Sequence, residues 1–207
     1  MDGRLGDIFG GRDVMNEDRQ KIWDNYRGIT NGSLERMFLY YNRYYEAGLI
    51  FDALKRNDTS MKNFKVLDYG CGVADYGIYF ARLGADVTVH DIDHAAVMFA
   101  ESRFALENLE VKRGISRDKD YNLVIFGEVL DHLFSPLQAL EEMVDSRISF
   151  IFTSSYPYRS DDKNDVHWQH DHHPETARMQ QSDCRILLKR NYAREILTGE
   201  GSLWVRR

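Results

Sequence analysis

Two glycines and an aspartate in this sequence have the spacing of a nucleoside-binding unit. Gly70 and Gly72 follow a short apolar segment, residues 64–69, and precede a helix-like segment, residues 74–84. Glycines in such a turn let the backbone approach a ligand closely, and the N-terminus of the following helix adds partial positive charge. Asp91 ends the next apolar segment, where a carboxylate can accept hydrogen bonds from both hydroxyls of a ribose.

Two further carboxylates indicate which nucleoside the unit binds. A dinucleotide-binding turn needs a third glycine three residues after the second, for close packing of helix on strand, but Asp75 occupies that position. Asp68 lies two residues before the first glycine, where its charge would repel a phosphate and attract a cationic group. S-adenosylmethionine fits because it has a ribose, an ammonium and a sulfonium but no phosphate. The same features disfavour a nicotinamide-dependent dehydrogenase.

Histidines supply candidate bases for proton transfer. The segment HWQHDHH places four of them in a polar loop, namely His167, His170, His172 and His173. Because histidine titrates near neutral pH, His167 or His170 is a candidate to deprotonate an acceptor. The competing interpretation is a solvent-facing loop without a chemical role. Aspartates accompany these histidines, but the adjacent His172 and His173 match no defined ligand spacing, so no metal site is predicted.

The composition is that of an ordinary globular protein. The chain has 207 residues, of which 43% are hydrophobic and 29% charged, enough for one domain with a full core. The formal net charge of −6 argues against a nucleic-acid partner. No apolar segment approaches the roughly 20 residues of a membrane span, and the N-terminus has no signal-like core. We therefore expect a cytoplasmic protein without a membrane partner. The two cysteines suggest no disulfide framework.

Apolar periodicity along the chain predicts an α/β fold. Short apolar segments alternate with helix-like segments from residue 64 to residue 155. Such alternation means crossover connections, a parallel sheet and helices on both faces. After these, residues 174–182 are predicted to form a short helix. Residues 184–192 and 201–207 are predicted to be two strands of an antiparallel hairpin that closes the sheet.

Two segments resemble a known family. VLDYGCGVADYGIYFARLGADVTVHDID, residues 66–93, resembles motif I and the following acidic strand end of the class I S-adenosylmethionine-dependent methyltransferases. YNLVIFGEVLDHLFSPLQALEEM, residues 121–143, resembles their fourth strand and the helix after it. The resemblance covers residues 64–155 and extends loosely to the hairpin. It implies a Rossmann-like, mostly parallel seven-stranded sheet whose last strand is antiparallel. Asn122 and Asp131 depart from the family's usual Asp and Glu, but neither belongs to the cofactor motif.

The resemblance implies roles for individual residues. Asp68 is expected to hold the ammonium, directly or through water. The methionine part of the cofactor is expected to lie under the backbone of Gly70 and Gly72, with the small Cys71 between them. Asp91 is expected to bind the ribose. The residues expected around the adenine and along the methionine side are Ile92, Ile115, Ser116, Gly127 and Glu128.

The N-terminal residues 1–60 are expected to form a helical cap over the cofactor. Residues 61–207 would then be the S-adenosylmethionine-binding methyltransferase domain, in one compact unit with the cap. Tyr26 and Arg27 are placed to close over the methionine carboxylate and exclude water. Tyr45 belongs to a predicted apolar stripe on these helices. These aromatic helices would equally suit a homodimer contact, so the sequence leaves the oligomeric state open.

The implied function is transfer of a methyl group from S-adenosylmethionine to an oxygen or nitrogen of a small-molecule acceptor. The family pattern also places His132 near the mouth of the pocket, as a third candidate contact, unless its hydrogen bonding only fixes the loop. The tetrapeptide after the fourth strand is GEVL, unlike the NPPY-like sequence of amino-methylating DNA enzymes. The alternative is a fold relative that binds S-adenosylmethionine or S-adenosylhomocysteine without methylating, in a regulatory role.

Overall fold

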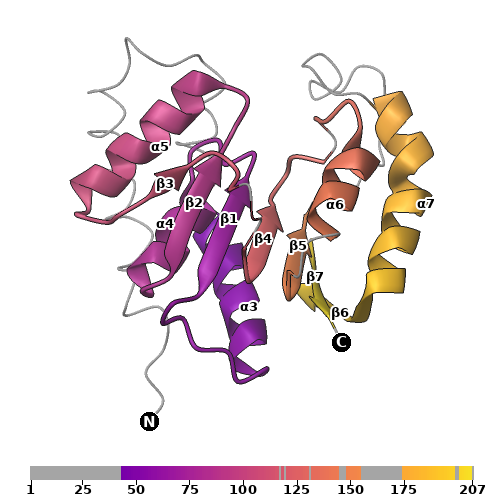
Figure 1. The fold of residues 1–207 in the computed structure, drawn as a ribbon, viewed down its shortest axis with the longest axis horizontal. Coiled ribbons are helices and arrows are strands. Elements are labelled where there is room, and N and C mark those ends of the chain that lie inside the picture. The colour runs from indigo at the N-terminus through magenta and orange to yellow at the C-terminus, as the bar shows by residue number, and fades with distance from the viewer. Residues whose placement is uncertain are drawn as a thin grey trace.

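The computed structural model describes residues 43–116, 118, 120–130, 132–144, 148–154, 174–198 and 201–206. The strands are β1 (Lys65–Tyr69), β2 (Asp86–His90), β3 (Lys112–Arg113), β4 (Leu123–Phe126), β5 (Phe150–Thr153), β6 (Tyr192–Thr198) and β7 (Gly201–Arg206). The helices are α3 (Tyr44–Lys55), α4 (Asp75–Arg82), α5 (His94–Leu106), α6 (Pro136–Val144) and α7 (Pro174–Asn191). The strands form one sheet in the order β3-β2-β1-β4-β5-β7-β6 (Figure 1).

The sheet has the predicted mixture of directions. Strands β1 to β5 are parallel, whereas β7 is antiparallel to both β5 and β6. The prediction of a mostly parallel, seven-stranded sheet with an antiparallel C-terminal hairpin is therefore confirmed. The strand order reverses at β1, because the chain returns from the β3 edge to place β4 on the other side of β1. Ligands of open α/β sheets bind in the crevice that such a switch point opens at the carboxyl ends.

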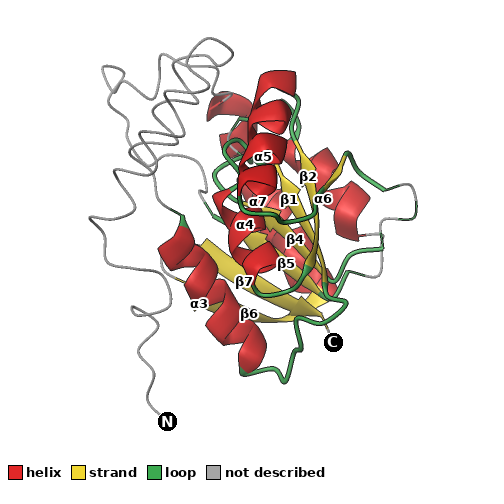
Figure 2. Ribbon diagram, turned by 90° about the vertical axis from the view of Figure 1, so that its left-hand side faces the viewer, coloured by secondary structure: helices red, strands yellow, loops and turns green. Residues whose placement is uncertain are grey.

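Side chains of the central strands alternate between two helical layers. Along β4, Leu123 and Ile125 pack in the cluster that includes α3, α4 and α5, whereas Val124 and Phe126 pack in the cluster that includes α6 and α7. Successive strand side chains point to opposite faces, so the sheet lies between two layers of helices (Figure 2). Within the described part of the chain, no helix has the length and apolarity needed to cross a membrane.

One predicted strand is wrong. Residues 184–191 continue helix α7, Tyr192 begins β6, and β6 is the hairpin strand instead. Cys184 and Leu188, one helical turn apart, are both buried in the cluster that includes α6, whereas Ile186 between them is 45% exposed. This spacing is helical. A short apolar run does not distinguish a buried strand from a buried helix by periodicity alone, and packing against α6 decides for the helix.

Helix α3 lies within the predicted cap and packs against α4. Tyr44 is buried and its ring centroid lies 6.4 Å from that of Tyr79. Tyr45, which was predicted to belong to the apolar stripe, is 77% exposed, because the buried stripe includes Tyr44, Ala47, Ile50 and Leu54 instead. Residues 1–42 lie outside the described residues, so a cap ending near residue 60 stays a prediction.

The turn after β1, here called the glycine turn (residues 70–74), packs against the loop after β4. Gly70 has a φ of +69°, and a Cβ built on it would lie 2.2 Å from Cγ2 of Val129. Glycine is therefore required both by the backbone conformation and by the contact. Gly84, after α4, has a φ of +88°, but a Cβ built there has nothing within 4 Å. The two glycines share the left-handed backbone and differ in packing.

We expect Gly70→Ala to lower the free energy of unfolding more than Gly84→Ala, by at least about 1 kcal/mol. Both substitutions place an L residue in a left-handed conformation, at a cost of about 1–2 kcal/mol, but only Gly70→Ala adds a clash with Val129. Chemical denaturation of the two variants measures the difference. Val129→Ala in the Gly70→Ala background should recover part of the loss, and equal losses in the two single variants would contradict the packing argument.

Candidate functional site

The carboxyl ends of the parallel strands bring most of the predicted cofactor-binding residues to one edge of the sheet. β1 pairs in parallel with both β2 and β4, so the residues that follow these three strands are neighbours. Those residues are Gly70, Cys71, Gly72, Asp91, Ile92, Gly127 and Glu128. Ile115 and Ser116 follow β3, which pairs with β2. These described members of the predicted set are therefore gathered at the switch point.

The backbone N–H groups at the start of the glycine turn bond to the protein itself. Those of Gly70 and Cys71 both donate to the carbonyl oxygen of His90, at 2.7 and 3.0 Å. That of Gly72 donates to Oδ2 of Asp91 at 2.9 Å. A phosphate-binding turn needs N–H groups that point at the ligand, and these three already have acceptors. The turn therefore suits a ligand without a phosphate.

Asp91 is oriented by two backbone donors. Besides the bond from Gly72, its Oδ1 accepts the N–H of Asp93 at 2.9 Å. Each carboxylate oxygen has a further acceptor position, so the side chain is fixed and can still accept from ribose hydroxyls. The next residue, Ile92, is 100% exposed. An apolar side chain left open beside this carboxylate is what an adenine ring would cover, so the pair fits an adenine nucleoside.

Asp68 lies beneath the first turn of α4 and caps it. The N-cap residue Ala74 has no side-chain cap bond, and Oδ2 of Asp68 accepts the N–H of Gly77 at 3.0 Å instead. Asp68 is 2% exposed. Burial raises the pKa of its carboxyl to about 8, and the charges of Asp75 and Asp91 add to the effect. Its expected contact with an ammonium stays a prediction.

Gly77 provides the close helix–strand packing expected of a third glycine. A Cβ built on it would lie 3.2 Å from Oδ2 of Asp68 and 3.3 Å from both Val87 and Phe104. The dinucleotide pattern specifies a glycine at position 75, which Asp75 occupies. The packing glycine lies two residues beyond that position. Its only signal in the sequence is a glycine inside a helical segment, which often has a packing reason.

The remaining predicted residues at this edge make contacts within the protein. Ile115 is half-buried and packs on the cluster that includes α6 and α7, while Ser116 is exposed and its N–H donates to the hydroxyl of Tyr121 at 2.7 Å. Cys71 is buried, and burial raises the pKa of its thiol well above the ordinary value. Cys71 therefore serves as a small neutral side chain. The contacts of these residues with a cofactor stay predictions.

Polar residues that the sequence pattern did not reveal lie around the predicted Glu128 at the end of β4, namely Arg43, Glu46, Tyr76 and Ser154. Glu128 has a left-handed backbone, with φ +56°, and its N–H donates to Oγ of Ser154 at 3.1 Å. Its carboxylate lies 3.7 Å from Arg43, which lies 3.9 Å from Glu46. Glu46 accepts the hydroxyl of the buried Tyr76, and burial, with the charge of Glu46, raises the pKa of Tyr76. Strained backbone of this kind clusters at functional sites, but only the fold brings these distant residues together.

Of the three candidate bases, the described residues include His132. Its side chain is exposed, and its backbone N–H donates to the carbonyl oxygen of Val129 at 3.0 Å, in the loop that packs on Gly70. Among the side chains that the structure does describe, no group of three His, Cys, Asp or Glu could hold a metal ion. The predicted site residues outside the described part of the chain are Tyr26, Arg27, His167 and His170.

The raised pKa of Asp68 makes stability depend on pH. An acid whose pKa rises from 3.8 to about 8 on folding binds more protons in the folded state. The contribution of this carboxyl to the free energy of unfolding is therefore largest at low pH. It is lost as the pH rises between these two pKa values, and the free energy of unfolding falls by at most about 1.4 kcal/mol per pH unit. Asp68→Asn keeps an oxygen for Gly77 and abolishes the titration.

We expect the free energy of unfolding of Asp68→Asn, relative to the unsubstituted protein, to increase from about pH 5 to about pH 8. Urea denaturation at several pH values measures this difference. Asp86→Asn, at a half-exposed carboxylate of the same sheet, controls for the loss of a charge. A difference for Asp68→Asn that does not change with pH would show that Asp68 ionises normally in the folded protein.

Comparison with known proteins identifies the family and its fold. A family model described as "Tellurite resistance protein TehB" matches residues 36–152, whereas no curated protein matches the chain. Magnesium protoporphyrin IX methyltransferase (ChlM) of Synechocystis PCC 6803, solved with SAH, is 17% identical with a TM-score of 0.58, covering 94% of this chain and 98% of that one. A TehB-like SAM-dependent methyltransferase of Corynebacterium glutamicum ATCC 13032 is 18% identical with a TM-score of 0.51, covering 94% and 99%. A ribosomal protein L11 methylase of Lactobacillus delbrueckii subsp. bulgaricus is 19% identical with a TM-score of 0.51, covering 77% of each chain.

The solved structures share the fold, and the family model is more specific. It spans more than half of the chain and includes the glycine turn, Asp91 and the end of β4. The resemblance to class I methyltransferases and the predicted cofactor, S-adenosylmethionine, are confirmed by these matches. The chain belongs to the TehB family of S-adenosylmethionine-dependent methyltransferases.

Proposed function

We propose that this protein transfers the methyl group of S-adenosylmethionine to an oxygen or nitrogen of a small-molecule acceptor. The observation that supports it most is the glycine turn with Asp91 bonded to it. The turn offers no spare N–H group at Gly70, Cys71 or Gly72 to a phosphate, while the carboxylate is fixed where a ribose would bind. A nucleoside without phosphate is the ligand that this arrangement favours.

The charges at the edge favour a cationic cofactor. Asp91 lies at the glycine turn, and Glu128 lies at the end of β4, where the methionine part is expected. A carboxylate near a sulfonium or an ammonium is attractive, whereas a pyrophosphate would be repelled. Arg43 lies beside Glu128. Among the described residues, it is a cation on the side where Arg27 was expected to bind the methionine carboxylate.

Most of the predicted residues have a part of their own in the proposal. Asp91 would hold the ribose, and Ile92, Ile115 and Ser116 would surround the adenine. Gly127 and Glu128 would line the methionine side, and Tyr26 and Arg27 would close over it. Methyl transfer from a sulfonium is a direct displacement, so the protein must align the acceptor, exclude water and, for a weak nucleophile, supply a base. His132, His167 and His170 are the proposed candidates for that base.

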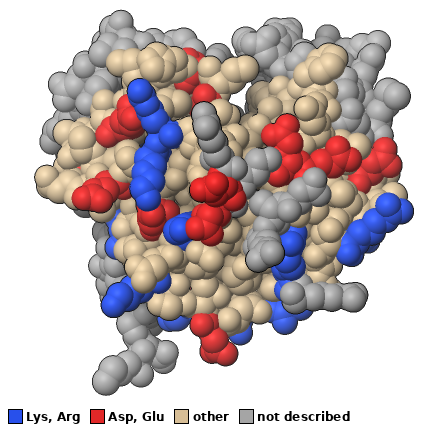
Figure 3. Space-filling view, viewed as in Figure 1, with Lys and Arg blue, Asp and Glu red and all other residues tan. Residues whose placement is uncertain are grey.

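The surface supports a small acceptor rather than a nucleic acid. On the face shown in Figure 3, acidic and basic side chains of the described residues are interspersed, and they form no continuous basic band there. Nucleic-acid binding depends on such a band to neutralise phosphates. The names of the structural neighbours include both a porphyrin methyltransferase and a protein methylase. Because the family is named for tellurite resistance, tellurite belongs in the acceptor screen with hydroxyl and amine compounds.

We expect Asp91→Ala to weaken S-adenosylhomocysteine binding at least about tenfold, because hydrogen bonds to a charged group contribute about 1.5–3 kcal/mol. Isothermal titration calorimetry measures the affinity. The control is Asp93→Ala, which removes a carboxylate two residues away that caps α5 and should lower stability without a comparable loss of affinity. Unchanged affinity in Asp91→Ala would rule out the ribose assignment. Titration with NAD in parallel should show no binding.

We expect His167→Ala, His170→Ala and His132→Ala to bind S-adenosylhomocysteine as the unsubstituted protein does, while at least one of them slows methyl transfer about a hundredfold or more. Turnover is followed with the acceptor that the screen identifies. His172→Ala, in the same segment as His167 and His170, is the control. Normal turnover in all three would place the base elsewhere. Cofactor binding without transfer to any screened acceptor would favour a non-methylating role.

A further inference from the structure

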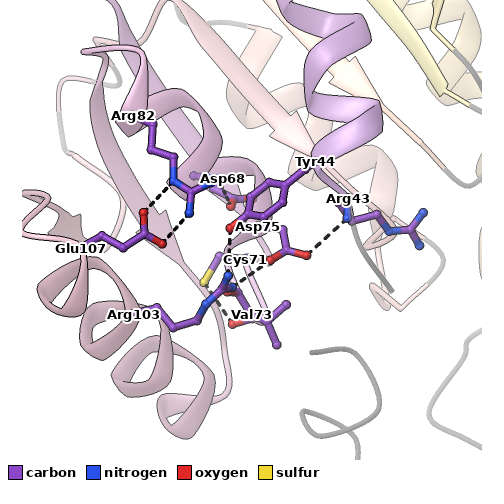
Figure 4. A network of polar contacts seen from close by, with 11 residues as sticks. Arg43, Tyr44, Asp68, Cys71, Val73, Asp75, Arg82, Arg103 and Glu107 are labelled. Carbon is purple, nitrogen blue, oxygen red and sulfur yellow. Dashed lines mark hydrogen bonds and ion pairs between the residues drawn. The ribbon is translucent and has the colours of Figure 1, made fainter. Parts of the chain in front are cut away.

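A buried arginine joins the glycine turn to two helices. Arg103, on α5, is 4% exposed. Its guanidinium donates to the carbonyl oxygen of Val73 in the turn, to Oδ1 of Asp75 at 2.9 Å and to the hydroxyl of Tyr44 at 3.1 Å (Figure 4). Arg43 adds a backbone N–H to Oδ2 of Asp75, at 3.3 Å. The first residues of α3 and α4 and the turn therefore meet at one cation.

The glycine turn needs such an anchor because it ends in a strained residue. Ala74 has φ +58° and ψ +37°, the left-handed conformation that glycine adopts freely and alanine does not. Its N–H donates to the carbonyl oxygen of Cys71 at 2.6 Å and so closes the turn. The carbonyl of Val73 belongs to the same peptide plane as the N–H of Ala74. A donor on that carbonyl therefore restrains the φ of Ala74 directly.

The carboxylate of Asp75 does not present a free charge to the proposed cofactor site. It is 2% exposed, and its two oxygens accept from Arg103 and from the backbone of Arg43. A buried carboxylate paired with an arginine and further hydrogen bonds is compensated, whereas the same group without its partner would be costly. Arg103 thus both neutralises the first residue of α4 and holds the turn that precedes it.

We propose that Arg103 is a positioning residue for the cofactor. By fixing the peptide between Val73 and Ala74, it keeps the glycine turn in the shape that directs the Gly72 N–H to Asp91. Arg103 bonds to the peptide of the turn, whereas the ribose is expected at Asp91. The inference rests on the proposed function in one respect, that the turn and Asp91 bind S-adenosylmethionine.

Arg82 is the matched control. It lies on α4 and donates to Glu107, the C-cap residue of α5, at 2.6 and 2.8 Å. Its guanidinium also lies over the ring of Tyr44 on α3, at 5.1 Å (Figure 4). Its ion pair is at the last turn of α4, whereas Arg103 acts at the first. Arg82→Met therefore measures how the loss of an α4–α5 arginine contact affects stability and Kd when the glycine turn is unchanged.

The test is calorimetric titration with S-adenosylhomocysteine, well below the melting temperature of every variant. We expect Arg103→Met to raise Kd about tenfold or more, and Arg82→Met to lower the melting temperature while changing Kd less than about twofold. In an Ala74→Gly background, the effect of Arg103→Met should shrink at least about threefold, since glycine adopts the left-handed conformation without the restraint.

Each outcome decides between the alternatives. A folded Arg103→Met with an unchanged Kd overturns the proposal, and a loss that Ala74→Gly does not reduce overturns the role of the Val73–Ala74 peptide. If Arg103→Met does not fold, Arg103→Lys takes its place. Lysine keeps the charge beside Asp75 but cannot span Val73, Asp75 and Tyr44 together, so it should raise Kd by a similar factor. No binding by the unsubstituted protein would overturn the proposed function, and this inference with it.

Discussion

The hydrogen bond from the Gly72 N–H to the Asp91 carboxylate is the contact on which the proposed cofactor site depends. It ties the turn after β1 to the end of β2, and its geometry follows from the parallel pairing of these strands. The carboxylate is oriented by this bond and by a second one from Asp93. Because the N–H groups of the turn are used in this way, the site differs in kind from a phosphate-binding turn built on the same strand, turn and helix.

The packing around that bond leaves little freedom. Gly70 admits Val129 from the loop after β4, and Gly77 lets α4 approach Asp68 and β2. Beneath the turn, Asp68 caps α4 and Arg103 compensates Asp75. Buried polar groups stabilise a structure only when each has its partner, and here the partners come from four different elements. The glycine turn is thus held by the surrounding fold more than by its own sequence.

The fold by itself does not specify the methyl acceptor. The three solved structures compared above are 17–19% identical to the chain, and their names include porphyrin and protein methyltransferases. The sheet and its carboxyl edge are common to the fold, whereas acceptors are selected by residues added around it. In this chain, Arg43, Glu46, Tyr76 and Glu128 form a polar set beside the end of β4.

Local patterns in the sequence determined the fold class, the cofactor and most of its edge. Alternating apolar segments, the spacing of Gly70 and Gly72, and the acid at Asp91 are visible in a linear chain because strand and helix periodicities repeat over a few residues. The tertiary structure alone decided that residues 184–191 are helical, that Gly77 rather than position 75 is the packing glycine, and that Asp75 is paired with Arg103. Each of these depends on contacts between residues distant in sequence, whose partners are set only when the helices pack on the sheet.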